Sequence, residues 1–223
     1  MIGFVVAMEK EAKLFLETAN IKESLNIANK KIYVGSFCNQ EFVLIIGGIG
    51  KVNAGMSTQL LIDKFQVDKI INFGTAGGKD PENQHVGDVA LIDKVCQFDF
   101  DLSEIDDVNI GYMQDFDLTY FESNYKKYKG NKFILSTLGT GDRFTFKDWA
   151  LNDQKELGAT VIDMEGGAIA QVAYANGVEF YLIKVLTDVE GSGEESIFKQ
   201  YYDNVKEVSD LIPNAVKELI ENI

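Results

Sequence analysis

The sequence predicts an α/β protein with a twisted, mostly parallel but mixed central sheet that is flanked by helices in a three-layer arrangement. Two observations support this class. Short apolar runs alternate with helical patterns along the chain, and two of these runs end abruptly in the carboxylates Asp163-Met164-Glu165 and Thr187-Asp188. The 223 residues include only two prolines and no linker-like stretch, so we expect one domain over residues 1–223.

The first half of the chain alternates between strand and helix patterns. Residues 2–7 form a short apolar run that is typical of a buried strand, and the apolar spacing in residues 9–18 predicts an amphipathic helix. A hairpin across the polar turn at 38–40, a helix and a further strand are expected next, over residues 32–35, 42–47, 52–65 and 69–73. The glycine-rich stretch 74–78 should follow that strand as a loop, either a plain tight turn or a phosphate cradle that lacks the P-loop ending.

The second half continues the same alternation. Strands are expected over residues 89–92, 133–138, 161–163 and 181–187, and helices over 118–128, 165–175 and from 194 onward. Pro213 should kink or restart the last helix, because proline cannot donate the backbone hydrogen bond of a helix interior.

Composition excludes several classes of function. Acidic residues outnumber basic residues 35 to 21, so the formal charge of −14 argues against a nucleic-acid partner. No apolar stretch reaches the roughly 18 residues that a membrane span needs. Cys38 and Cys96 lack metal or redox spacing, and the chain starts without a signal-like segment. We therefore expect a reduced, cytoplasmic protein that acts on small molecules.

Polar residues follow several of the predicted strands. Glu11, Thr75, Asp142, Glu165 and Asp188 each come shortly after an apolar run, and Ile49-Gly50 follows the hairpin. The carboxyl ends of strands in an open α/β sheet meet at one rim, where ligands bind. Carboxylates held there among apolar neighbours can have the raised pKa values that proton transfer needs.

Seven motifs in order resemble one family. They are Ala7-Met8-Glu9-Lys10-Glu11, Gly48-Ile49-Gly50-Lys51-Val52-Asn53-Ala54, Asn72-Phe73-Gly74-Thr75-Ala76-Gly77-Gly78, Val86-Gly87-Asp88-Val89, Gly141-Asp142-Arg143-Phe144, Asp163-Met164-Glu165 and Thr187-Asp188. Together they are similar to the 5′-methylthioadenosine/S-adenosylhomocysteine nucleosidases of the purine nucleoside phosphorylase superfamily. The resemblance extends from residue 2 to about residue 198, and it implies that the predicted three-layer fold is nucleoside phosphorylase-like.

The resemblance implies hydrolysis of the bond between adenine and a 5′-thio-substituted ribose, with no metal and no cofactor. Asp188 would be the general acid to the purine, and Glu11 would orient and activate the water. Glu165 would accept hydrogen bonds from the ribose hydroxyls. The remaining implied contacts are Met164 under the sugar, Phe144 and the Thr145 backbone at the purine, and Met8, Ile49 and Phe198 around the 5′-thio group.

The chain also departs from the family pattern. Lys184 stands where the family usually has arginine, and Thr75 and Thr187 stand where it usually has serine, so these three residues are expected in the substrate site with altered chemistry. Lys184 could contact the water or a carboxylate. Gln97-Phe98-Asp99 replaces Tyr-His-Asp, and the acidic loop over 103–115 does not align with the segment that closes over the 5′ substituent. The resemblance further implies a homodimer with loops shared between sites.

Simpler interpretations stay open at this point. Asp188 could be a helix N-cap, Glu165 a first-turn residue favoured by the helix dipole, and Glu11 part of a solvated helix face. Met164 and Phe144 could be core residues. We assign no catalytic role to His85, and the Tyr125-Lys126-Lys127-Tyr128-Lys129 cluster reads as a solvated helix end.

Two other functions also remain open. The first is a different purine nucleoside hydrolase or a phosphorylase of the same fold, although the single arginine, Arg143, disfavours a phosphate site. The second is a noncatalytic nucleoside-binding protein.

Overall fold

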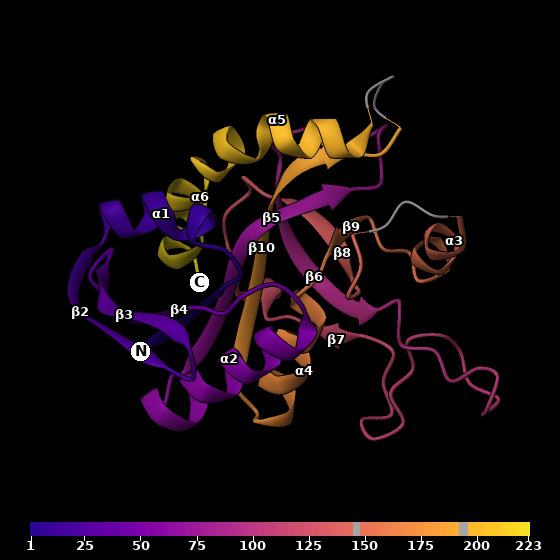
Figure 1. Ribbon diagram of the computed structural model, residues 1–223, viewed down its shortest axis with the longest axis horizontal. Coiled ribbons are helices and arrows are strands. Elements are labelled where there is room, and N and C mark those ends of the chain that lie inside the picture. Colours follow the sequence, from indigo (N-terminus) through magenta and orange to yellow (C-terminus); the bar gives the residue numbers. More distant parts are fainter. Residues whose placement is uncertain (145–147, 192–195) are drawn as a thin grey trace.

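The computed structural model describes residues 1–144, 148–191 and 196–223, which form a ten-stranded mixed sheet with helices on both sides (Figure 1). This arrangement confirms the predicted fold class. The strands are β1 (Ile2–Val6), β2 (Asn20–Ile27), β3 (Lys30–Phe37), β4 (Gln40–Ile46), β5 (Lys69–Gly78), β6 (Val89–Gln97), β7 (Phe121–Glu122), β8 (Ile134–Thr140), β9 (Val161–Asp163) and β10 (Glu179–Val189). The helices are α1 (Glu9–Thr18), α2 (Lys51–Phe65), α3 (Asp148–Glu156), α4 (Gly166–Ala175), α5 (Ile197–Ser209) and α6 (Ile212–Glu221), with a short 3-10 turn, η1 (Tyr125–Lys127).

The sheet closes on itself over half of its strands. Its order is β10-β6-β8-β9-β5-β1-β4-β3-β2, with β7 paired to β6, and β10 pairs with β5 as well as with β6. Strands β5, β10, β6, β8 and β9 therefore form a ring, while β1, β4, β3 and β2 extend from it as an open sheet. The pairs β1–β4, β1–β5, β5–β10, β6–β8 and β8–β9 are parallel, and the remaining pairs are antiparallel.

Helices cover both sides of the sheet. Figure 1 shows α1, α5 and α6 along one side and α2 and α4 along the other. Under the first group, Phe4, Phe15, Phe42 and Phe73 are buried, with the Phe4 ring centroid 5.1 to 5.5 Å from the other three. Such tilted and edge-on aromatic contacts stabilise a core beyond the apolar area that they bury.

The N-terminal elements follow the prediction, with one strand added. The β3–β4 hairpin turns at Cys38 and Asn39, whose φ angles of 50° and 60° match the two-residue turn favoured by twisted hairpins. Strand β2 was not predicted. Among the described strands it pairs with β3 alone, and most of its residues are exposed, so its sequence lacks the alternation that marks a half-buried strand.

The helix predicted over residues 118–128 is wrong. This segment instead forms β7, which pairs Phe121 with Val95 and Glu122 with Lys94, followed by the turn η1. Phe121 is buried and packs against Phe116 and Tyr174. The aromatic residues of this segment thus serve tertiary packing rather than a helical face.

The glycine loop predicted over residues 74–78 is also wrong, because β5 continues through it. Its register with β10 runs from Gly74 opposite Lys184 to Gly78 opposite Val189. Glycine is needed here for close approach rather than for a turn: a Cβ on Gly74 would lie 2.9 Å from Glu11 Oε1, and one on Gly77 would lie 2.9 Å from Asp188 Oδ2.

The C-terminal region contains two helices. Helix α5 ends at Ser209, and α6 restarts at Ile212 with Pro213 in its first turn, as the proline predicted. The expected helix start at Glu194 lies outside the described residues. Among the helices that the structure describes, none is long and apolar enough to cross a membrane.

Candidate functional site

One cavity lies where β1, β5, β9 and β10 end, beside α5. Most of the predicted site residues line it: Met8, Glu11, Ile49, Thr75, Phe144, Met164, Glu165, Thr187 and Asp188. Lys184 and Phe198 are not among the lining residues, and Thr145 lies outside the described residues. Segments far apart in the sequence are therefore brought to one rim of the sheet, as the strand-end pattern predicts.

Glu11 is held on one wall of the cavity by three donors. It lies in the first turn of α1 but is only 3% exposed, so it is not part of a solvated helix face. Its Oε1 accepts hydrogen bonds from the Thr75 N–H at 2.7 Å and the Thr75 hydroxyl at 2.8 Å, and its Oε2 accepts one from the Met8 N–H at 3.1 Å. Burial raises the pKa of Glu11, although the Thr75 N–H and the Lys184 charge oppose this shift.

Asp188 lies on another wall and is positioned by a β-bulge. The register of β10 against β5 shifts at Thr187, so that Leu186 faces Ala76 but Asp188 faces Gly77. Asp188 is inside a strand, which rules out the helix N-cap alternative. Its Oδ1 accepts a 2.6 Å hydrogen bond from the Thr187 hydroxyl, and burial raises its pKa above the ordinary value for aspartate.

Glu165 occupies the N-cap position of α4 without capping that helix. Its Oε1 instead accepts a 2.9 Å hydrogen bond from the Gly50 N–H, just before α2. The residue is 8% exposed. Burial, followed by the neighbouring Asp163 carboxylate, raises the pKa of Glu165 to about 7. The Glu165 carboxylate is thus directed into the cavity rather than toward the dipole of its own helix.

A buried ion pair lies behind these carboxylates. Lys184 Nζ lies 2.7 Å from Asp163 Oδ2, and both side chains are almost fully buried. Asp163 also accepts hydrogen bonds from the Thr140 hydroxyl at 2.5 Å and the Gly166 N–H at 2.8 Å. Burial opposes the charge on Lys184, but Asp163 and Glu165 together raise its pKa. The lysine therefore contacts a carboxylate, one of the two partners expected for it.

The apolar part of the site is partly open. Met8 and Met164 are half-buried, whereas Ile49, Phe144 and Phe198 are 51%, 46% and 44% exposed, so Phe144 is not a core residue. The Phe144 and Phe198 rings stack with centroids 5.3 Å apart. Aromatic side chains exposed beside a cavity form a surface on which a flat or apolar ligand group can bind.

Sequence reasoning missed several residues of this region. Lys79, Glu190 and Tyr201 line the cavity but were not predicted, and Asp163 was predicted only as part of a motif. Asp163 ends a predicted strand, so its position could have been found from the same pattern as Asp188. Lys79 and Glu190 follow directly on β5 and β10, but a charged residue after a strand is too common to stand out. No sequence pattern pointed to Tyr201.

A polar network ties the rim together next to the cavity. Asp99 Oδ1 lies 2.6 Å from Lys51 Nζ, and Asp99 Oδ2 accepts the Asp142 N–H at 2.8 Å. Asp142 Oδ1 in turn accepts the Lys51 N–H at 2.8 Å. This network joins the start of α2 to the segment that carries Phe144, so it fixes the Gly50 N–H that holds Glu165.

The other departures from the family pattern lie outside the cavity lining. Gln97 donates a hydrogen bond to Gln171, and Phe98 is fully buried against the glycines Gly139 and Gly141. In the loop over 103–115, the residues other than Val108, Ile110, Gly111, Tyr112 and Met113 are exposed, and none of its residues lines the cavity.

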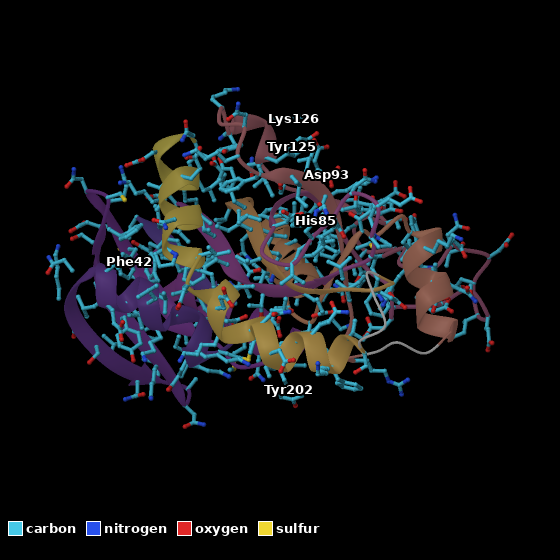
Figure 2. All side chains as sticks on the ribbon, turned by 90° about the horizontal axis from the view of Figure 1, so that it is seen from above. Phe42, His85, Asp93, Tyr125, Lys126 and Tyr202 are labelled. Atoms are coloured by element: carbon cyan, nitrogen blue, oxygen red, sulfur yellow. The ribbon has the colours of Figure 1, made fainter. Side chains whose placement is uncertain are left out.

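Two groups given no catalytic role also lie away from the cavity. The His85 side chain is 80% exposed. Figure 2 shows Tyr125 and Lys126 on a turn at the edge of the molecule, and Lys126 pairs with Glu122. Across the described residues, no group of three or more histidine, cysteine or acidic side chains is arranged to hold a metal ion.

Comparisons with known proteins agree on one family. The model of the phosphorylase superfamily matches residues 1–221. A 5′-methylthioadenosine/S-adenosylhomocysteine nucleosidase from Listeria welshimeri is 34% identical over 90% of this chain and 91% of its own length, and one from Marinomonas is 31% identical over 95% and 96%. The solved Streptococcus pneumoniae MTA/SAH nucleosidase in complex with 8-aminoadenine superposes with a TM-score of 0.88, at 26% identity, over 100% of this chain and 99% of that one.

Proposed function

Because the chain belongs to the 5′-methylthioadenosine/S-adenosylhomocysteine nucleosidase family of the phosphorylase superfamily, we propose that it hydrolyses the N-glycosidic bond of these two nucleosides. The products are adenine and the 5′-thio-substituted ribose. One observation carries the proposal: the buried carboxylates Glu11, Glu165 and Asp188 come from three separate segments and line one cavity.

Asp188 is the proposed general acid. When the bond from ribose C1′ to the purine nitrogen breaks, its electron pair leaves with the base, and a proton delivered to the purine N7 makes that base a neutral leaving group. Burial favours the protonated carboxyl that this step needs, and proton transfer from a positioned acid is typically worth about 10²–10⁴-fold in rate.

Glu11 is the proposed group that orients and activates the water. The three hydrogen bonds from Thr75 and Met8 fix the direction of its carboxylate. The water oxygen bonds to C1′ of the oxocarbenium-like sugar, and Glu11 accepts the proton that the water loses. Glu165 accepts hydrogen bonds from the ribose hydroxyls, with Met164 against the sugar, and Lys184 serves as the buried counter-ion of Asp163 rather than as a direct contact.

The remaining cavity residues are assigned to binding. Phe144 stacks on the purine, while Met8, Ile49 and Phe198 surround the 5′-thio group. Thr75 and Thr187 orient the two catalytic carboxylates through their hydroxyls. The exposure of the Phe144 and Phe198 rings supports a substrate that covers both when it binds, with the purine against Phe144 and the apolar 5′ substituent against Phe198.

The test of this function is release of free adenine. Purified protein is incubated with methylthioadenosine, adenosylhomocysteine, adenosine and inosine, each with and without phosphate, and free base is separated by chromatography. Adenine from the 5′-thio nucleosides without phosphate is the expected result. Dependence on phosphate would instead make the protein a phosphorylase, and no base release would favour the noncatalytic alternative.

Asp188→Asn tests the general acid. The variant keeps the shape of the side chain but cannot donate a carboxyl proton, so turnover should be abolished while the thermal unfolding midpoint stays close to that of the parent. Activity equal to that of the parent would remove Asp188 from this role.

We further propose that the protein is a cytoplasmic homodimer whose chain folds as a single domain. Exposed apolar side chains on α2 and α4 support the dimer: Val52 is 83% exposed, Met56 41% and Tyr174 48%. Val52→Glu should shift the molar mass measured by light scattering from dimer to monomer. A parent protein that is monomeric at micromolar concentration would refute the dimer.

A further inference from the structure

An ion pair lies at the ends of the two strands that frame Asp188. Lys79 directly follows β5 and Glu190 directly follows β10, and their side chains pair across the two strands. Both residues line the same cavity as Asp188. Their side chains are 14% and 34% exposed, so water screens their charges only in part.

The backbone on both sides of this pair is fixed. The Glu190 N–H donates to the Gly78 carbonyl at 3.0 Å, and the Lys79 N–H donates to the Thr160 carbonyl at 2.9 Å and to Gln84 Oε1 at 3.0 Å. The two charges are therefore held at the strand ends rather than on mobile loops. An ion pair held in this way has a defined distance to neighbouring groups.

Asp188 lies within reach of both charges. The β-bulge places Asp188 opposite Gly77, with Asp188 Oδ2 2.9 Å from the position that a Gly77 Cβ would occupy. Gly77 comes two residues before Lys79, and Asp188 comes two residues before Glu190. After burial and the Thr187 hydroxyl, the next influences on its pKa are these two charges, Lys79 lowering it and Glu190 raising it. Their effects oppose each other while the pair is intact.

We propose that the Lys79–Glu190 ion pair is a positioning element for the general-acid step: it holds one positive and one negative charge together at the ends of the two strands that carry Gly77 and Asp188, so that neither charge acts alone on the Asp188 carboxyl. The pair acts through Asp188, and this inference rests on the proposed hydrolase function. It assigns a role to two residues that neither the family motifs nor the carboxylate pattern selected.

Other charged or titratable groups also line this cavity, and none of them is changed in the variants described below. They are Glu11 of α1, Arg143 after β8, Asp163 of β9, Glu165 before α4 and Tyr201 of α5, with Lys184 of β10 buried behind them. Because the variants below change only Lys79 and Glu190, any difference in pH response between them arises from this pair.

The experiment compares Lys79→Met, Glu190→Gln and the double variant. The pH dependence of kcat/KM for adenine release from methylthioadenosine is measured, and its basic limb reports loss of the proton from the general acid. Lys79→Met should move this limb to higher pH and Glu190→Gln to lower pH, each by about half a pH unit or more, because a close charge shifts a carboxyl by such amounts. The double variant should return toward the parent.

The opposite signs separate this role from a structural one. Loss of either partner breaks the same ion pair, so a purely structural pair predicts the same change in both single variants. Shifts in the same direction, or no shifts, would overturn the proposal. Lys22→Met and Glu41→Gln, which break an exposed pair on β2 and β4, are the matched controls and should leave the profile unchanged. A parent protein that releases no adenine would refute the proposed function instead.

Discussion

Replacing Gly74 with alanine should slow catalysis and leave the fold intact. The added Cβ would lie 2.9 Å from Glu11 Oε1 and 3.3 Å from the Glu11 carboxyl carbon. Ordinary van der Waals contact begins near 3.4 Å, so the carboxylate must move by about half an ångström. Because the clash involves only the end of a side chain, the backbone of β5 need not move, and the cost in stability should stay within the about 1–3 kcal/mol that is typical of one added carbon in a packed site.

The displaced Glu11 carboxylate should slow the reaction. Oε1 is the oxygen that accepts both Thr75 hydrogen bonds, at 2.7 and 2.8 Å, and a displaced carboxylate cannot keep both. A hydrogen bond to a charged group is worth about 1.5–3 kcal/mol, so kcat/KM should fall by about 10- to 100-fold.

The assay follows adenine release alongside thermal unfolding. Gly55→Ala in α2 is the control, because its Cβ would meet Val172 at an ordinary 3.6 Å. If Gly74→Ala keeps full kcat/KM with its fold intact, the carboxylate position argued for Glu11 is wrong.

Three further predictions concern neighbouring groups. Lys184→Met should lower the unfolding free energy measured in urea by about 3–5 kcal/mol, because it leaves the Asp163 carboxylate buried without a partner, and Lys184→Arg should lose less. Between the ordinary pKa of 4.5 and about 7, Glu165 holds a proton only when folded, so the unfolding free energy should fall as pH rises through this range, by about 3 kcal/mol at most. Urea unfolding of Glu165→Gln should show a flatter pH dependence, and an unchanged slope would contradict the assignment. Phe198→Ala should raise KM for methylthioadenosine more than it lowers kcat, because it removes the ring stacked on Phe144 but no reacting group; steady-state kinetics that show the reverse split would contradict a binding role.

The sequence was sufficient to predict the residues at the rim of the site and much of the layered fold. Apolar runs that end in carboxylates predicted Glu165 and Asp188 at strand ends, and the helical spacing of Ala12 and Phe15 predicted α1. These signals are local, because strand burial and helix periodicity are visible within a few residues. The hairpin at Cys38 was predicted for the same reason.

The features that the sequence did not reveal depend on contacts between distant segments. The pairing of β10 with both β5 and β6 closes the ring, and nothing in residues 179–189 alone indicates two partners. The Lys184–Asp163 ion pair depends on that closure. The glycines of 74–78 look like a turn in the sequence, whereas their purpose is to leave space for Glu11 and Asp188.

The β-bulge at Thr187 has a consequence for how this site could arise or disappear. Residues that face each other on paired strands share a face of the sheet, and the extra residue sets Asp188 opposite Gly77 instead of Gly78. If β10 paired with β5 without the bulge, Asp188 would lie opposite Gly78 and point to the other face, while the strands and the helices around them could remain as they are. The difference between a protein that can donate this proton and one that only binds the nucleoside is therefore as small as a shift of one residue in strand register.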